Sequence, residues 1–124
     1  MKFISLQHIS IEDPGTFKDF LIEDGHSITT IQLDEGDSIP NNLDEFDAML
    51  CMGGPMDTFM EDQYPWLVAE KKAIGEYVLN LKKPFLGFCL GCQLLGEVLG
   101  GKVVESKPPE IGVLDINIEA GAKE

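Results

Sequence analysis

The sequence of 124 residues contains no arginine, and its nine lysines face 22 aspartates and glutamates, which gives a formal net charge of −13. Binding to DNA or RNA depends on cationic side chains that neutralise phosphates, and the forked guanidinium of arginine is the group best suited to phosphate recognition. A chain this acidic, without any arginine, has no electrostatic surface for that purpose. We therefore expect no nucleic-acid partner.

Long hydrophobic runs are also missing, because no stretch approaches the roughly 20 consecutive apolar residues of a membrane span. The first residues, Met1 to Ser5, lead into a strand pattern and not into the apolar segment of a signal peptide. We therefore expect a cytoplasmic protein without membrane association. Cysteine is scarce and odd in number, and Cys51, Cys89 and Cys92 are expected to be reduced thiols.

Hydrophobic residues make up 44% of the chain and charged residues 25%, the balance of an ordinary globular domain that can close one core. The sequence shows no internal repeat, low-complexity segment or domain boundary. Residues 1–124 are therefore interpreted as a single domain.

Strand and helix patterns alternate along the chain. Strands are predicted at residues 3–6, 27–33, 48–52, 85–88, 102–105 and 113–119, and helices from 17 to the glycine at 25, at 65–81 and at 90–99. The run at 48–52 is continuously apolar, as in a strand buried on both faces, whereas 113–119 alternates, as in a half-buried strand. This order with short connections predicts an α/β fold, a mostly parallel sheet with helices on both faces.

The segment Gly87-Phe88-Cys89-Leu90-Gly91 has the glycine-x-nucleophile-x-glycine pattern between a predicted strand and a predicted helix. The flanking glycines remove Cβ atoms that would collide in so tight a turn. Cys89 then lies at the amino end of a helix, where free N–H groups and the helix dipole favour the thiolate that attacks carbonyls. We predict that Cys89 is a catalytic nucleophile; a buried structural cysteine is the alternative.

A second glycine motif, Gly53-Gly54-Pro55, follows the buried strand at 48–52 and should lie near Cys89 at the same end of the sheet. Backbone N–H groups of this loop, together with the N–H of Leu90, can point at a developing oxyanion. Taken alone, the motif is equally consistent with a simple turn.

Together these motifs resemble the class I glutamine amidotransferases, in particular the stand-alone members similar to the amidotransferase domain of GMP synthetase. The resemblance covers nearly the whole chain. It is carried by Met52-Gly53-Gly54-Pro55-Met56, by Tyr64-Pro65-Trp66-Leu67 with Glu70, by Gly87-Phe88-Cys89-Leu90-Gly91-Cys92-Gln93, by Leu99-Gly100-Gly101 and by Pro109-Glu110-Ile111-Gly112.

The resemblance implies a flavodoxin-like arrangement in which Cys89 attacks the side-chain amide of L-glutamine, forms a glutamyl thioester and releases ammonia. It also implies that Gly54 and Leu90 line the oxyanion hole and that Gly53 and Gln93 bind the substrate. No cofactor or metal is implied. A synthetase that accepts the ammonia is the implied partner.

One part of the family's pattern is missing. In that family a histidine acts as general base and a glutamate orients it, both from a downstream His-x-Glu motif. This sequence contains only His8 and His26, neither in such a motif, and we expect each to be a surface or packing residue. The chain is therefore interpreted as the amino-terminal part of an amidotransferase domain, incomplete at its carboxyl end.

The missing residues have two expected consequences. General-base assistance contributes about 10²- to 10⁴-fold to a rate, so the isolated chain should hydrolyse glutamine poorly unless another polypeptide supplies the base. A sheet without its last strands also leaves open edges and apolar surface, which predicts a homo-oligomer.

Two other classes of function stay open. Cys89-Leu90-Gly91-Cys92 is a Cys-x-x-Cys at the start of a helix, as in thiol redox proteins, although it comes late in the chain. A single cysteine pair does not complete a four-ligand zinc site. A non-catalytic binding or scaffold protein with the amidotransferase fold is the stronger alternative, because the base is missing.

Overall fold

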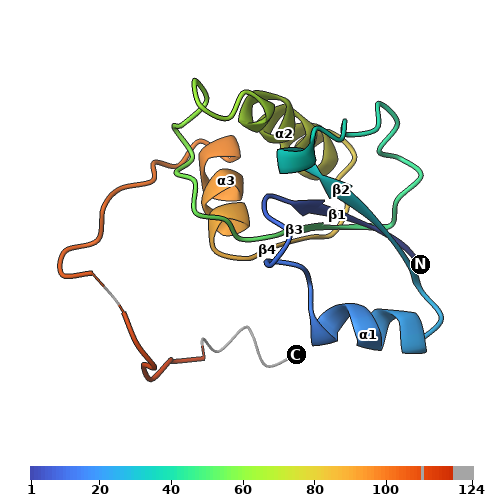
Figure 1. The fold of residues 1–124 in the computed structure, drawn as a ribbon, viewed down its shortest axis with the longest axis horizontal. Helices are drawn as coiled ribbons and strands as arrows, with labels where there is room; N and C mark the ends of the chain where they lie inside the picture. The colour runs from blue at the N-terminus through green and yellow to red at the C-terminus, as the bar shows by residue number, and fades with distance from the viewer. Residues whose placement is uncertain (110, 119–124) are drawn as a thin grey trace.

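The computed structural model describes residues 1–109 and 111–118, and Figure 1 shows its architecture. At the centre is a four-stranded sheet with the order β2-β1-β3-β4. The strands are β1 (Lys2–Gln7), β2 (Ser27–Gln32), β3 (Ala48–Cys51) and β4 (Phe85–Gly87). All three strand pairings are parallel, which confirms the predicted α/β class.

Helices cover both faces of this sheet, as predicted. Their bounds are α1 (Thr16–Glu23), α2 (Trp66–Gly75), continued by the π-helical turn η2 (Glu76–Asn80), and α3 (Leu90–Val98), while β2 ends in a 3-10 turn, η1 (Leu33–Glu35). Helix α1 lies on one face, and α2 and α3 lie on the other (Figure 1). Within the described part of the chain, no helix combines the length and apolarity that crossing a bilayer would need.

The core is divided by the sheet because successive side chains of a strand point to opposite faces. All four residues of β3 are buried, which confirms the continuously apolar strand predicted there. The larger cluster, on the α2 and α3 side, includes Ile4, Leu6, Met49, Cys51, Leu67, Ile74, Tyr77, Leu90 and Leu94. The smaller cluster, on the α1 side, is Phe3, Leu21, Ala48, Leu50 and Met52.

The predicted strands at 102–105 and 113–119 are wrong. Residues 101–109 and 111–118 form neither strand nor helix, and Figure 1 shows them running away from the sheet. Glu110 and Glu119 lie outside the described residues. The apolar side chains of this segment, among them Val104, Val113 and Ile116, are exposed. An alternating pattern becomes a half-buried strand only where a neighbouring strand and a packing face are available, and no described element offers them here.

Candidate active site

Cys89 lies at the turn between β4 and α3, with φ 48° and ψ −106°. L residues rarely adopt this backbone conformation, which costs on the order of 1–3 kcal/mol. A Cβ at Gly87 would come within 2.6 Å of the Cys92 nitrogen, and a Cβ at Gly91 would overlap the carbonyl oxygen of Cys51. Backbone contacts therefore require both glycines that flank the turn.

The thiol of Cys89 is free and exposed, and the residue is the N-cap of α3. The N–H groups of Cys92 and Gln93 donate to its carbonyl at 3.0 and 3.1 Å, which closes the first turn of the helix. An anion at this position benefits from the helix dipole. Gln93 is exposed in the same turn.

The loop after β3 lies directly beside this turn. The N–H of Phe88 donates to the Cys51 carbonyl at 2.9 Å, and that of Gly91 donates to the Met52 carbonyl at 3.2 Å. A Cβ built on Gly53 would be 3.5 Å from the Cβ of Cys89. Two strands that are distant in sequence thus bring their carboxyl ends together.

Two backbone donors are free at this junction. Among residues 1–109 and 111–118, no hydrogen bond pairs the N–H of Gly54 or of Leu90. Gly54 is closely surrounded: a Cβ there would be 3.0 Å from the Cβ of His8 and 3.2 Å from a methyl carbon of Leu90. The structure therefore gathers Gly53, Gly54, Cys89 and Leu90 at one point, and their chemical roles stay predictions.

Beneath the loop lies a buried polar cluster that the sequence interpretation missed. His8 and Glu70 are both 0% exposed, and His8 Nε2 lies 2.8 Å from Glu70 Oε1. The other ring nitrogen, Nδ1, lies 2.8 Å from the carbonyl oxygen of Gly53. The buried thiol of Cys51 donates to Glu70 Oε1 at 3.3 Å.

His8 was expected to be a surface or packing residue, and this is only partly correct. Its ring does pack, stacking on Trp66 with 5.3 Å between centroids, but both of its nitrogens are also engaged. Glu70 lies three residues after Leu67 and four before Ile74, so helical spacing places it on the buried stripe of α2. That spacing was a signal in the sequence.

The electrostatics of the cluster favour a charged His8. Burial lowers the pKa of His8, but the hydrogen bond and charge of Glu70, the Gly53 carbonyl and the charge of Glu12 together raise it above its ordinary value. Burial, and then the charge and hydrogen bond of Glu70, raise the pKa of the Cys51 thiol well above its usual range. Cys51 is therefore a neutral donor.

His8, Cys51 and Glu70 are also a group that could hold a metal ion, because their ligand atoms lie within 4.8 Å of one another. A tetrahedral zinc bound to nitrogen and oxygen at about 2.1 Å would hold these two atoms roughly 3.4 Å apart. The observed 2.8 Å between His8 Nε2 and Glu70 Oε1 is a hydrogen-bond distance instead. As arranged, the cluster is held together by hydrogen bonds.

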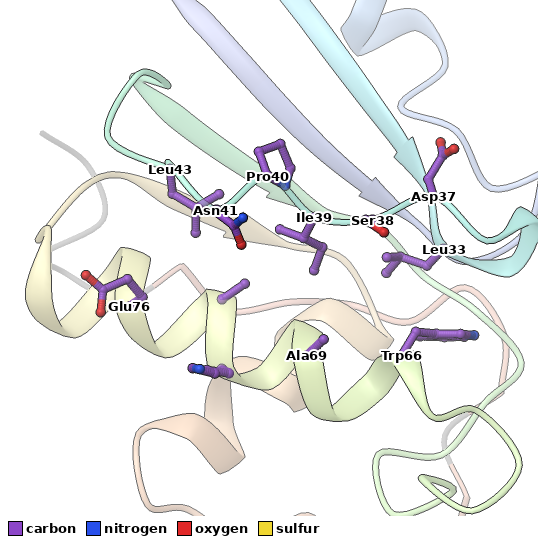
Figure 2. A pocket seen from close by; sticks show the side chains of 12 residues that line it. Leu33, Asp37, Ser38, Ile39, Pro40, Asn41, Leu43, Trp66, Ala69 and Glu76 are labelled. Carbon is purple, nitrogen blue, oxygen red and sulfur yellow. The ribbon is translucent and has the colours of Figure 1, made fainter.

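A groove of about 550 Å³ lies between helix α2 and the loop that follows η1 (Figure 2). Its lining includes Leu33, Ile39, Leu43, Trp66 and Ala69, and none of the predicted site residues. Figure 2 shows Trp66 at one end of the groove, where the same side chain stacks on His8. The groove is therefore separate from the junction at Cys89.

Comparison with known proteins gives a consistent result. The family described as glutamine amidotransferase class-I matches residues 17–122. The chain is 35% identical over 120 residues to the putative glutamine amidotransferase-like protein YfeJ of Salmonella typhimurium, covering 94% of this chain and 50% of that protein. It is 40% identical over 79 residues to a glutamine-hydrolyzing GMP synthase subunit from Sulfurisphaera tokodaii, covering 61% of this chain and 37% of that protein.

Solved structures show the same fold. A glutamine amidotransferase from Thermotoga maritima aligns with a TM-score of 0.76 and 34% identity, over 81% of this chain and 43% of its own. A glutamine amidotransferase from Methylobacillus flagellatus aligns with a TM-score of 0.81 and 32% identity, over 90% of this chain and 43% of its own. The chain spans about half the length of the Salmonella protein YfeJ.

Proposed function

The chain belongs to the class I glutamine amidotransferase family, and from this premise we propose that residues 1–124 form the nucleophile-bearing part of a glutamine-hydrolysing domain. One observation carries the proposal. An exposed, backbone-strained Cys89 at the start of α3 lies beside two free backbone donors, the N–H groups of Gly54 and Leu90.

In the proposed reaction, the Cys89 thiolate attacks the side-chain amide carbon of L-glutamine and forms a carbon–sulfur bond. The amide oxygen becomes an oxyanion, which accepts hydrogen bonds from Gly54 and Leu90; one such donor is worth about 10²- to 10³-fold in kcat. Gly53 and Gln93 hold the substrate. Collapse of the adduct breaks the carbon–nitrogen bond and releases protonated nitrogen as ammonia, and water then hydrolyses the thioester to glutamate.

The proton transfers of this reaction need a base that we do not find in this sequence. Both nitrogens of His8 are engaged by Glu70 and Gly53, and His26 lies at the amino-terminal end of β2 beside the terminal amine of Met1. We therefore propose that the 124-residue chain alone turns over glutamine poorly, and that further polypeptide supplies the base.

We also propose that the ammonia passes to a synthetase partner in the cytoplasm, in keeping with a relative named as part of GMP synthase. The chain alone should self-associate. A shallow apolar depression of about 250 Å³ lies between α1 and β4, where Phe17 and Leu86 are 38% and 44% exposed. Light scattering that shows only monomer at high concentration would contradict self-association.

The nucleophile is tested by labelling the chain with an electrophilic glutamine analogue, followed by peptide mapping. Label should appear on Cys89 and disappear in Cys89→Ala. The matched control is Cys92→Ala, which removes an exposed cysteine of the same turn and should keep the label. Label on Cys92 instead would contradict the proposal, and binding of glutamine without any labelling would favour the scaffold alternative.

A further inference from the structure

We propose that His8, held by Glu70, is a positioning residue for the oxyanion hole: it fixes the carbonyl of Gly53 and thereby aims the N–H of Gly54 at the substrate oxygen beside Cys89. This inference rests on the proposed function and adds a residue to its site. His8 itself does not touch the reacting atoms.

The inference follows from the planarity of the peptide bond. In a trans peptide the C=O of one residue and the N–H of the next point in opposite directions. His8 Nδ1 holds the Gly53 oxygen at 2.8 Å on the interior side, so the Gly54 N–H must point outward, away from His8. Cys89 lies beside this loop, since a Cβ built on Gly53 would be 3.5 Å from the Cβ of Cys89.

Glycine at 53 and 54 makes such a support necessary. Glycine has the widest backbone freedom of any residue, so a Gly-Gly loop has no intrinsic preference for one peptide orientation. A side chain at residue 54 cannot substitute for the support, because a Cβ there would lie 3.0 Å from the Cβ of His8 and 3.2 Å from a methyl carbon of Leu90. A hydrogen bond from a rigid donor fixes the peptide without adding atoms to the loop.

The donor is rigid because His8 is held on every side. Its ring is fully buried, it stacks on Trp66 at an interplanar angle of 20°, and Glu70 holds the opposite nitrogen. The Gly53 carbonyl and the Glu70 carboxylate can only accept hydrogen bonds, so a doubly protonated imidazolium satisfies both. The titratable groups facing His8 are Glu70, Cys51 and Glu12.

Two double variants test the inference. The amide nitrogen of asparagine is two bonds from Cβ, as Nδ1 of histidine is, so His8→Asn keeps a donor toward Gly53. The amide nitrogen of glutamine is three bonds away, as Nε2 is, so His8→Gln keeps only the contact with residue 70. Both are made together with Glu70→Gln, because a buried carboxylate left without its partner is strongly destabilising. Glu70→Gln alone is the reference.

Each protein reacts with a chloromethyl ketone analogue of glutamine and, separately, with iodoacetamide. The Cys89 thiolate adds to the ketone carbon and creates an oxyanion before the sulfur is alkylated and chloride leaves. Iodoacetamide is attacked at its methylene carbon, iodide leaves, and no oxyanion forms. The ratio of the rate with the ketone to the rate with iodoacetamide therefore measures how well the site stabilises the oxyanion. Differences in the exposure and ionisation of the thiol affect both rates and cancel in this ratio.

Since one oxyanion donor is worth about 10²- to 10³-fold, the ratio should fall about tenfold or more in the His8→Gln double variant and stay within about threefold of the reference in the His8→Asn double variant. The NMR resonances of the Gly53 carbonyl and Gly54 amide should shift only in the former. Equal ratios with unshifted resonances in both would overturn the inference. A native chain unlabelled by the ketone would overturn the proposed function instead, and the resonances alone would then decide the positioning.

If neither double variant folds, the native chain provides the test. On deprotonation, His8 keeps its remaining proton on Nε2, because the bond to the Glu70 carboxylate is charge-assisted, and the bond to Gly53 is lost. The Gly53 carbonyl resonance should therefore move over the same pH range as the His8 ring resonances. A Gly53 resonance that stays constant while His8 titrates would overturn the inference.

Discussion

Cys89 occupies a backbone conformation that glycine adopts freely and alanine does not, with φ 48° and ψ −106°. We predict that Cys89→Gly is more stable than Cys89→Ala. Releasing the strain is worth about 1–3 kcal/mol, from which the larger conformational freedom of glycine in the unfolded chain subtracts about 0.4–1 kcal/mol. From the middle of both ranges, the expected net difference is roughly 1.3 kcal/mol.

The comparison isolates the backbone because the two variants differ only by one Cβ at an exposed site. Equilibrium urea unfolding measures the difference, with the fluorescence of the single tryptophan, Trp66, as the signal. The matched control is Ala69→Gly, at an exposed position inside α2, where glycine should cost about 1 kcal/mol.

The two glycine substitutions should therefore have opposite signs. If Cys89→Gly is less stable than Cys89→Ala by an amount similar to the loss in Ala69→Gly, the turn stores no strain and the reasoning fails. Neither Cys89 variant should take up the electrophilic glutamine analogue, so any gain in stability is accompanied by loss of the proposed nucleophile.

Three further predictions concern stability and are measured by urea unfolding. Gly91→Ala should cost about 2–3 kcal/mol, because its Cβ overlaps the Cys51 carbonyl, whereas Gly96→Ala in the same helix meets nothing within 4 Å and should gain up to about 1 kcal/mol; equal effects would contradict this. The pKa of His8 is raised in the folded state, so protonated His8 stabilises the fold fully below its ordinary pKa of 6.5, and this stabilisation is lost as pH rises through the raised folded pKa. Glu70→Gln should flatten this dependence of the free energy of unfolding on pH. A pH profile of unfolding that is the same in Glu70→Gln and in the native chain would refute the prediction. Lys71→Met should cost less than about 1 kcal/mol, and added salt should shrink the effect, because Lys71 pairs with Glu61 and Glu97 near the surface; a larger, salt-independent loss would contradict this.

Local signals in the sequence determined most of the fold and the turn at the proposed nucleophile. The continuously apolar run at β3 and the helical spacing from Trp66 to Tyr77 each reflect burial along one element, and neighbouring residues encode that burial. The glycine at 91 is required by the carbonyl of Cys51, which is distant in sequence, but the glycine at 87 is dictated by the backbone of one tight turn, because a Cβ there would meet backbone atoms of Gly91 and Cys92. Such constraints act over a few residues and are readable without tertiary information.

Contacts between distant residues were decided only by the tertiary structure. His8 and Glu70 are 62 positions apart, and no local pattern pairs them; parallel pairing of β1 with β3 beneath α2 brings them together. The strand prediction at 113–118 was wrong because it also depends on distant residues. A half-buried strand forms only where another strand supplies hydrogen bonds and a core covers one face of it. The sequence alone determined the position of the proposed nucleophile, Cys89. The packing of the sheet decided that His8 holds the Gly53 carbonyl in the loop beside it.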